Sequence, residues 1–535
     1  MSDSKQTAEA AVVGHARHDH RLLRQTLKIS ATTALVVYCV AATGYLGLRY
    51  VLLPRIDDFR PRIETIVSEK LHANVRITRL APHWLGYEPG IDVTGLTIRD
   101  SHGDVALAVP QATATVSWTS LVRGKPVLSS LIVEKPDVLV ARATDGSLSI
   151  AGVQVPTTHK GNDTFSTWLL SQQAIVLRGG TLRWRDAKKD APELALRDIR
   201  VAILNNGFEH RIALQAPAEG TLFKGPLDFR ARFHHRALHA IGKPQNWTGQ
   251  AYVSTGTVDL PTLACYVDLP LKMYAGGIDN AIWASFSGGH LRSAHGELQG
   301  YDVALRVRPA QPKLDVPIAH FGWALDIDPQ REYRLRLTNL LAELGQPPLA
   351  DGTPVVRTLA LKTLTGRYRI ANVEHGQLMS VTGDRVDLGV LAEFSRALPV
   401  PPRFLNVLVR FDPRGLVENY TFELERARPE NETAASEQRV SGAAPIIRYR
   451  VKGDLQGISV AAQEPPPGLS PTGHPRAGLP GFENLRGSID ADQTHGTITL
   501  DAVNAGVTIP GVFDDPRLKF DRLRGRGQWT VAPAV

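Results

Sequence analysis

Cysteine is nearly absent from this sequence. The 535 residues contain two cysteines, Cys39 and Cys265. A single pair so far apart in the chain cannot provide a disulfide framework. Low cysteine content suits an exported bacterial domain that does not depend on disulfides for its stability.

The short motifs of common enzyme classes are also missing. We find no G-x-x-x-x-G-K phosphate loop, no H-E-x-x-H or C-x-x-C metal motif and no G-x-S-x-G nucleophile elbow. The nearest arrangement of a nucleophile and a histidine is Ser285-Phe-Ser-Gly-Gly-His290, which a hairpin turn explains better. We therefore expect no catalytic residues, no cofactor-binding residues and no metal ligands.

Clustered charge of one sign is lacking. The net charge of +8 comes from 61 Lys and Arg against 53 Asp and Glu. The cations are scattered along the chain and do not form a block interleaved with stacking aromatic residues. Nucleic acid is therefore not an expected partner.

Long apolar runs are rare, and only one is long enough to cross a membrane. The stretch Ile29–Leu53 reads ISATTALVVYCVAATGYLGLRYVLL, and Ile29–Leu48 carries no charge. As a helix, this uncharged part measures about 30 Å, the thickness of the hydrocarbon core of a bilayer. Lys28 and Arg49 would then lie at the two interfaces. We expect a single anchor over 29–53.

Two alternatives surround the anchor. A cleaved signal peptide would also explain an apolar run followed by small residues, but the lead-in of residues 1–28 is long for one. After Pro54, apolar residues at spacings of three and four predict an amphipathic helix over 54–74. That helix either caps the first sheet or lies on the membrane surface.

Beyond residue 75 the apolar period changes from helical to two. Apolar and charged residues alternate along several segments, which predicts antiparallel strands with one dry and one wet face. These segments are Leu182–Arg185, Leu227–Phe233, Tyr301–Arg308, Tyr333–Leu337 and Ile447–Lys452. Helical spacing is scarce, with short candidates at 165–172 and 260–266.

The order of several motifs resembles a known family. Ile77-Thr-Arg-Leu-Ala-Pro-His-Trp84 is followed by Pro89-Gly-Ile-Asp-Val-Thr-Gly-Leu-Thr-Ile-Arg-Asp100. Leu121-Val-Arg-Gly-Lys-Pro-Val and then Leu139-Val-Ala-Arg-Ala-Thr-Asp-Gly146 come next. Together with the anchor, this order resembles the N-terminal region of the YhdP branch of the AsmA-like proteins, over residues 28 to 155.

The resemblance implies a fold and a function. It implies a mainly β protein with an N-terminal transmembrane helix, an elongated twisted antiparallel sheet that forms an open groove, and few short helices. It places 1–28 in the cytoplasm and the bulk in the periplasm of a Gram-negative bacterium, anchored in the inner membrane. The groove would carry phospholipid toward the outer membrane, with outer-membrane or periplasmic proteins as further partners. The family has no catalytic residues to transfer.

The expected organisation follows from these observations. After the tail (1–28), the anchor (29–53) and the amphipathic helix (54–74), we expect a first β unit at 75–160 and a β-groove at 161–427. A polar loop at 428–445 precedes further groove repeats at 446–535, which are truncated relative to the longer family members. The candidate residues lining the groove are the apolar members of the alternating strands: Leu227, Phe229, Phe233, Val303, Leu305, Val307, Tyr333, Leu335, Leu337, Ile447, Tyr449 and Val451.

Alternation alone leaves other functions open. The same dry faces could pack together as closed β-sandwiches in a non-catalytic structural or assembly factor of the cell envelope. A weaker option is a folding factor that binds outer-membrane proteins by strand addition at exposed sheet edges.

Overall fold

The computed structural model divides the chain into two compact units. Unit 1 comprises Met1–Pro136 with Ala151–Val153, and unit 2 comprises Asp137–Ile150 and Gln154–Val535. The structure describes residues 27–71, 73–99, 103–120, 124–125, 127–155, 164–217, 220–236, 239–269, 271–309, 311–329, 332–346, 355–371, 376–397, 402–426, 447–465, 478–513 and 515–531. The tail before residue 27 and the polar loop at 428–445 lie outside these ranges.

Unit 1 begins with the expected long helix. Leu27–Glu69 is helical and contains a stretch apolar enough to cross a membrane, none of it buried by the rest of the protein. Where the apolar run ends, the helix first widens into a π-helical turn (η1, Leu48–Leu52) and then narrows into a 3-10 segment (η2, Leu53–Phe59). Pro54 sits at the start of η2, and Arg55 leaves the helical conformation, so the proline bends the chain and does not end the helix.

The amphipathic segment caps the first sheet. α2 (Arg60–Leu71) precedes β1 (Asn74–Arg76), β2 (Arg79–Leu85), β3 (Glu88–Arg99), β4 (Val105–Val116) and β5 (Leu128–Glu134). Arg60 Nη1 donates to the carbonyl of Thr78 at 2.7 Å, and Glu64 Oε1 accepts from the amide of Ile77 at 2.6 Å. Asp57 Oδ1 accepts from the amide of Leu80 at 2.9 Å. These bonds satisfy backbone groups in β2 and in the link between β1 and β2, and they fix the helical segment to the sheet.

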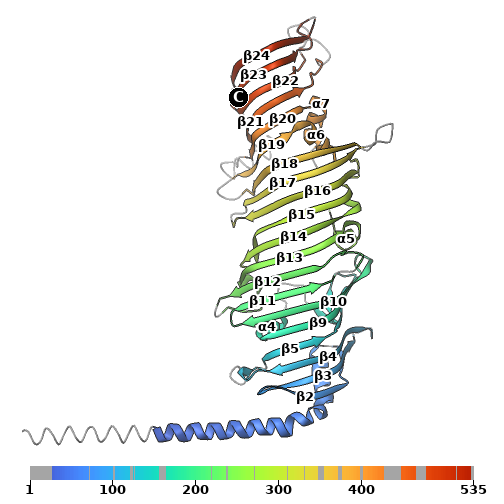
Figure 1. Ribbon diagram of the computed structural model, residues 1–535, viewed down its shortest axis with the longest axis vertical. Helices are drawn as coiled ribbons and strands as arrows, with labels where there is room; N and C mark the ends of the chain where they lie inside the picture. Colours follow the sequence, from blue (N-terminus) through green and yellow to red (C-terminus); the bar gives the residue numbers. More distant parts are fainter. Residues whose placement is uncertain are drawn as a thin grey trace, which may run out of the picture. The chain divides into compact units, whose positions relative to one another are not determined.

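Unit 2 is a long sheet that is antiparallel from β9 onward, while β6 runs parallel to β9 (Figure 1). It opens with β6 (Asp137–Arg142) and β7 (Leu148–Ile150), and the short β8 (Val153–Val155) follows. Each strand from β9 onward pairs with the next in the chain: β9 (Ala174–Asp186), β10 (Ala191–Asn206), β11 (Glu209–Ala216), β12 (Leu227–His235), β13 (Trp247–Asp259), β14 (Lys272–Ser287), β15 (His290–Arg306), β16 (Leu314–Ile327), β17 (Glu332–Gln346), β18 (Val355–Arg369), β19 (Gln377–Asp387), β20 (Arg414–Arg426), β21 (Ile447–Val460), β22 (Gly481–Asp492), β23 (His495–Thr508) and β24 (Arg517–Thr530). All five alternating segments therefore lie in strands, although β15 ends at Arg306 and leaves Val307 and Arg308 outside the strand.

The helices of unit 2 lie between strands. α4 (Thr164–Ser171) and α5 (Leu260–Tyr266) confirm the two short helices predicted from sequence. α6 (Leu388–Ala397) and α7 (Pro402–Phe411) were not predicted. Asp387 Oδ1 accepts from the amides of Gly389 and Val390 at the start of α6, which is an N-cap readable from the sequence.

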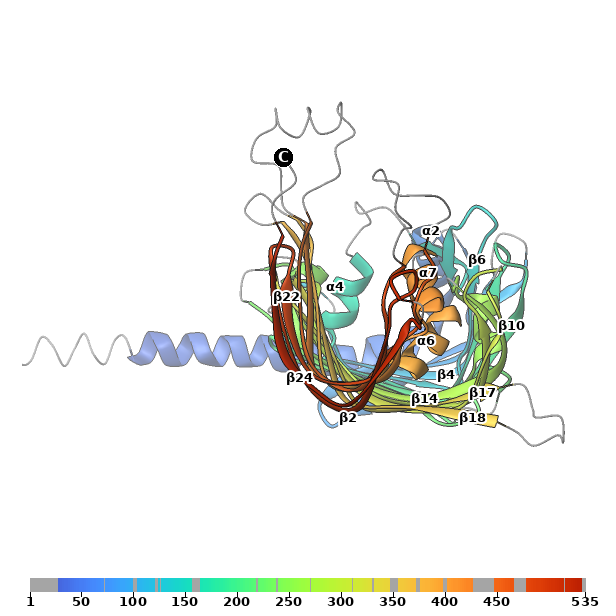
Figure 2. The ribbon, with the colours of Figure 1, turned by 90° about the horizontal axis from the view of Figure 1, so that it is seen from above.

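The sheet of unit 2 is curved rather than folded into a sandwich. Seen along the stack of strands, it bends into a trough, and α4, α6 and α7 lie on its concave side (Figure 2). The strands β9 to β24 belong to one sheet, and within the described residues no second sheet is stacked on it. The closed-sandwich arrangement is therefore not the one observed.

Bulges bend the strands. Asp198, Asp302, Asn339 and Asn419 have φ of 49° or 50°, and at each of them one strand advances three residues while its neighbour advances two. An extra residue of this kind kinks a strand, and Asp and Asn tolerate the left-handed conformation better than most residues. It also reverses the alternation, so that Leu337 before Asn339 and Ala342 after it both point to the concave side.

Candidate functional site: the concave face of unit 2

The cross-strand register builds a continuous apolar row on the concave face. Residues directly opposite in an antiparallel pair share a face, so a row can be followed from strand to strand. The first apolar row runs from β9 to β24 and contains no charged residue: Ile175, Ile203, Ile212, Ala231, Ala251, Ala284, Ala294, Leu325, Leu335, Gly366, Val381, Phe422, Val451, Ala491, Gly496 and Trp529.

A second apolar row lies beside the first. It runs from β9 to β20 and is also free of charge: Leu177, Val201, Leu214, Phe229, Val253, Ile282, Gly296, Trp323, Leu337, Leu364, Gly383 and Tyr420. On the other side of the first row, Tyr333 pairs with Tyr368, which pairs with Met379. That shorter row continues through Leu424 to Tyr449.

The opposite face has the reverse chemistry. One residue along from the first apolar row, the convex side presents Arg211, Arg232, Gln250, Ser285, Ser293, Asp326, Arg334, Arg367, Ser380, Glu423, Arg450 and Asp492 in register. Many of these charges are paired, for example Arg367 with Glu332 at 3.0 Å. From β11 to β22 this row is polar, so the sheet there has an apolar concave face and a polar row on its convex face.

One wall of the trough is covered by helices. Val303, Val316, Ala342 and Leu344 are buried with Leu260 of α5 and with Val390 and Phe394 of α6, and Leu305 packs against this cluster. Val303 and Leu305, two of the groove candidates, therefore lie in a packed core. Val307 lies beyond the end of β15, beside Tyr274 in a small hollow.

The other wall is largely open. Leu335 is 43% exposed and Tyr449 is 40% exposed, although both point to the concave side. The half-buried candidates on β12, β17 and β21 are Leu227, Phe229, Tyr333, Leu337 and Val451. Ile447 begins β21, and its side chain lies outside the described part of the structure. An exposed apolar strip of this extent is unusual for a soluble surface, where large contiguous patches mark binding sites.

α4 closes the trough locally near β10 and β11. Asn205 Nδ2 donates to the carbonyl of Gln172 at 2.6 Å, and His210 Nδ1 lies 2.7 Å from Asn205 Oδ1. Because the Asn205 amide already donates to backbone, its oxygen accepts and His210 Nδ1 donates. Phe233, 3% exposed, packs against the His210 and Trp247 rings with centroids at 5.0 and 4.7 Å.

Burial changes the acid–base properties of this cluster. The His210 side chain is fully buried and stacks on His235 with ring centroids 5.3 Å apart. Desolvation, with a smaller contribution from the neighbouring His235, lowers the pKa of His210 to about 4. The imidazole is therefore neutral at physiological pH and acts as a packing residue. No group of three potential metal ligands occurs among the residues that the structure describes.

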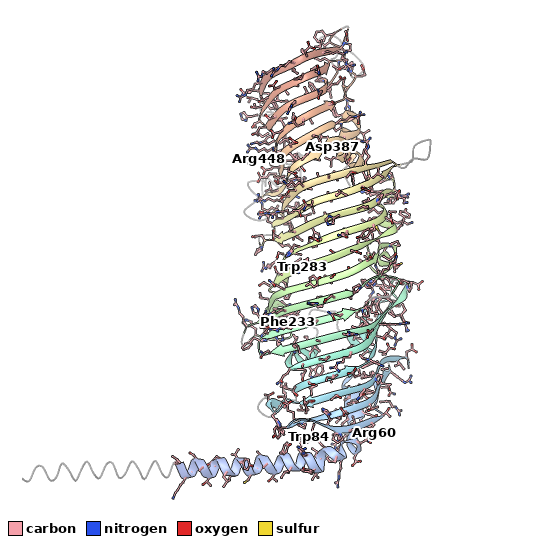
Figure 3. All side chains as sticks on the ribbon, viewed as in Figure 1. Arg60, Trp84, Phe233, Trp283, Asp387 and Arg448 are labelled. Atoms are coloured by element: carbon pink, nitrogen blue, oxygen red, sulfur yellow. The ribbon has the colours of Figure 1, made fainter. Side chains whose placement is uncertain are left out.

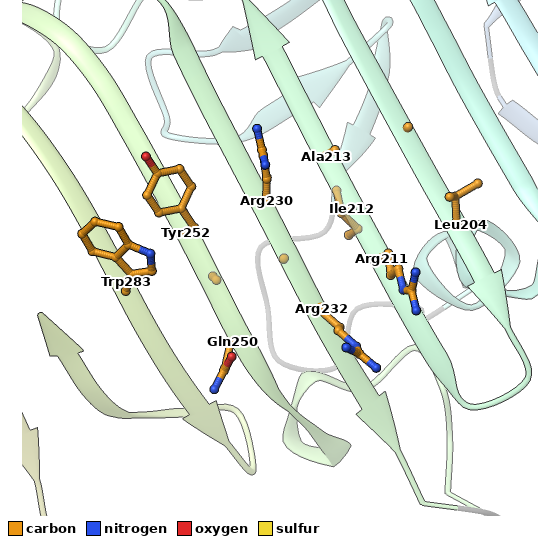
Figure 4. A pocket seen from close by; sticks show the side chains of 12 residues that line it. Leu204, Arg211, Ile212, Ala213, Arg230, Arg232, Gln250, Tyr252 and Trp283 are labelled. Carbon is orange, nitrogen blue, oxygen red and sulfur yellow. The ribbon is translucent and has the colours of Figure 1, made fainter. Parts of the chain in front are cut away.

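The convex face has a hollow of its own. A depression of about 410 Å³ on β10 to β14 is lined by Leu204, Tyr252 and Trp283 together with three arginines (Figure 4). Arg211 and Arg232 both pair with Glu209, at 2.7 and 3.0 Å, and Arg230 pairs with Asp228 at 2.6 Å. All three arginines of the hollow therefore form ion pairs with carboxylates, and none of them is left unpaired for an anionic ligand.

Comparison with known proteins agrees with the motif order at the N-terminus. No curated protein and no solved structure gives a match to this chain. The model of the YhdP protein family matches residues 19–533, which is nearly the whole length. The chain is a member of the YhdP protein family, of the AsmA-like type.

Proposed function

We propose that this protein carries phospholipid along the concave face of unit 2 and is anchored in the inner membrane with its bulk in the periplasm. The observation that carries the proposal is the first apolar row. It crosses every strand from β9 to β24 without a charged residue, while the adjoining row on the convex face is polar from β11 to β22. Family membership supports a role in lipid transport within the cell envelope.

The dimensions suit acyl chains. Fifteen steps between the sixteen neighbouring residues of the row, at about 4.8 Å each, give roughly 70 Å of apolar strip. An acyl chain that lies on this strip contacts side chains such as Leu335 and Phe422 with one side. This side of the acyl chain is thereby removed from water. Each methylene removed from water contributes about 0.8 kcal/mol, so no directional bonds are needed. A ligand held in this way is free to slide, because every position along the strip offers similar contacts.

Chemical catalysis forms no part of the proposal. The buried His210 of the trough is engaged in a hydrogen bond to Asn205 and in ring packing. The direction of travel would be toward the outer membrane, with outer-membrane or periplasmic proteins receiving the lipid.

Purification of the full chain tests the proposal. Mass spectrometry of the purified protein should detect copurifying phospholipid. The Leu335→Asp variant should retain markedly less, because a carboxylate interrupts the strip at an exposed position. Arg336→Asp changes the charge of the same strand on its convex side and should retain lipid as the unaltered chain does. Absence of phospholipid from the unaltered chain, or equal retention by the Leu335→Asp variant, would contradict the proposal.

A further inference from the structure

Arg49 lies in an aromatic cage at the end of the apolar helix. Its guanidinium carbon is 4.9 Å from the centre of the Trp84 ring and 5.9 Å from the centres of the Tyr45 and Tyr50 rings. Arg49 Nη1 donates to the Tyr45 hydroxyl at 2.6 Å. Trp118 adds a further ring 6.2 Å from Tyr45. The cation is half-buried, and three rings lie around it.

This cation has no carboxylate partner. Within the part of the chain that the structure describes, no Asp or Glu lies within ion-pair distance of Arg49. A guanidinium has five N–H donors, and the Tyr45 hydroxyl uses one of them. This distinguishes Arg49 from the arginines of the convex hollow, which are all paired. A half-buried guanidinium with free donors is suited to a planar or tetrahedral oxyanion, above all phosphate.

The cage lies where a lipid headgroup would be. It follows directly on the uncharged stretch Ile29–Leu48, and Tyr and Trp are the residues that prefer the boundary between hydrocarbon and water. Trp84 belongs to β2, which the Asp57–Leu80 and Arg60–Thr78 bonds hold against the helix. Trp84 and Arg60 both lie where the helix meets the first sheet (Figure 3).

We infer that Arg49, Tyr45, Tyr50 and Trp84 form a binding site for the phosphate of a phospholipid headgroup, at which lipid is taken from the membrane. The inference rests on the proposed lipid transport and adds a loading site in unit 1. The guanidinium would bind two phosphate oxygens, and the rings would contact the glycerol and the first methylenes. A lipid without phosphate would lose the charge-assisted bonds and keep only the apolar contacts.

The test uses the purified full chain and two lipids that carry the same photoreactive acyl chain. One is a phospholipid and the other is the corresponding diacylglycerol, which lacks the phosphate. After irradiation, trypsin releases the peptide Leu80–Arg99, which contains Trp84. Labelling of this peptide by the phospholipid should exceed labelling by diacylglycerol about tenfold, as expected for one or two charge-assisted hydrogen bonds.

The variants separate binding from folding. Arg49→Gln should reduce phospholipid labelling to the level of diacylglycerol, whereas Arg49→Lys keeps the charge and should retain part of the preference. Arg55→Gln, which removes a neighbouring exposed cation, should leave the preference unchanged. Circular dichroism of each variant checks the fold. Equal labelling by the two lipids in the unaltered chain, or a preference that survives Arg49→Gln, overturns the site.

Two further outcomes are distinguishable. If inorganic phosphate at a concentration no higher than that of the phospholipid abolishes the labelling, the site prefers free phosphate and the lipid assignment is wrong. The Leu335→Asp variant should be labelled in Leu80–Arg99 as the unaltered chain is. If lipid does not copurify but this peptide still shows the phosphate preference, transport along unit 2 fails and the headgroup site stands.

Discussion

The phenol of Tyr420 lies across Gly383, its direct partner in the β19–β20 pair. A Cβ at position 383 would collide with the ring, and burial raises the pKa of the phenol. Both residues belong to the second apolar row. Small residues beside large rings recur along the concave face, where Gly496 lies beneath Trp529 in the same way. The glycines therefore give aromatic rings room to lie flat on the sheet.

Replacement of Gly383 should be destabilising in proportion to this contact. Gly383→Ala places a methyl group against the Tyr420 ring, and overpacking of this kind costs about 1 to 3 kcal/mol. Gly525→Ala is the matched control, because a Cβ at Gly525 has no heavy atom within 4 Å. The control should be neutral or slightly stabilising, since alanine has less conformational entropy to lose. Urea unfolding of the two variants measures the difference, and equal effects would contradict the packing described for Tyr420.

Acid should destabilise unit 2 through His210. Its pKa is about 4 in the folded protein, below the usual 6.5, so the unfolded state binds the proton more readily. The stabilising contribution of the neutral imidazole is complete above about pH 6.5 and is lost as the pH falls toward 4. The loss is roughly 2 kcal/mol at pH 5. His210→Phe removes the titrating group, so its free energy of unfolding should fall less steeply between pH 6.5 and 4. Identical slopes for variant and unaltered chain would show that His210 is not buried neutral.

The covered wall should depend on α6. Phe394 is buried in the cluster with Val303 and Leu344, and Phe394→Ala should lower the free energy of unfolding by about 3 to 5 kcal/mol. Leu391 is on the same helix but is exposed, so Leu391→Ala should cost less than about 1 kcal/mol. Thermal or urea unfolding distinguishes the two. A small loss for Phe394→Ala would mean that α6 is not part of the core.

Period-two alternation was sufficient to predict strands in five segments, and in those segments it also predicts which residues share an apolar face and which share a polar face. Leu335 and Arg336 in β17 illustrate this, because Leu335 points to the concave face and Arg336 to the convex face, as the alternation predicts. The alternation could not show which apolar residues are covered. Val303 and Leu335 have the same local pattern, yet the first is buried beneath α5 and α6 and the second is exposed. Coverage is decided by helices that are distant in the sequence.

The start of α6 and the bulge in β17 both have signals in the sequence. Asp387 is an N-cap residue, and Val390 and Phe394 follow it at helical spacing, which indicates an amphipathic helix. The helix is short and follows a strand directly, which makes this signal hard to recognise. Asn339 interrupts an alternating strand with a residue that favours the left-handed conformation, which indicates a bulge. Without that bulge Ala342 would point to the convex side. A single Asn or Asp within an alternating strand therefore indicates a bulge, as a glycine pair indicates a turn. The Arg49 cage could not be predicted, because Trp84 reaches Arg49 only through the packing of β2 on the helix.

The most direct measurement is photo-crosslinking in living cells with one probe residue on each face of β17. A photoreactive amino acid at Leu335 should form adducts with phospholipid, since this position is exposed on the apolar concave face. The same probe at Arg336, the adjacent residue on the convex face, should form few. Lipid adducts at 335 but not at 336 are the predicted result. Equal adducts at both positions, or none at 335, would contradict lipid transport along the concave face.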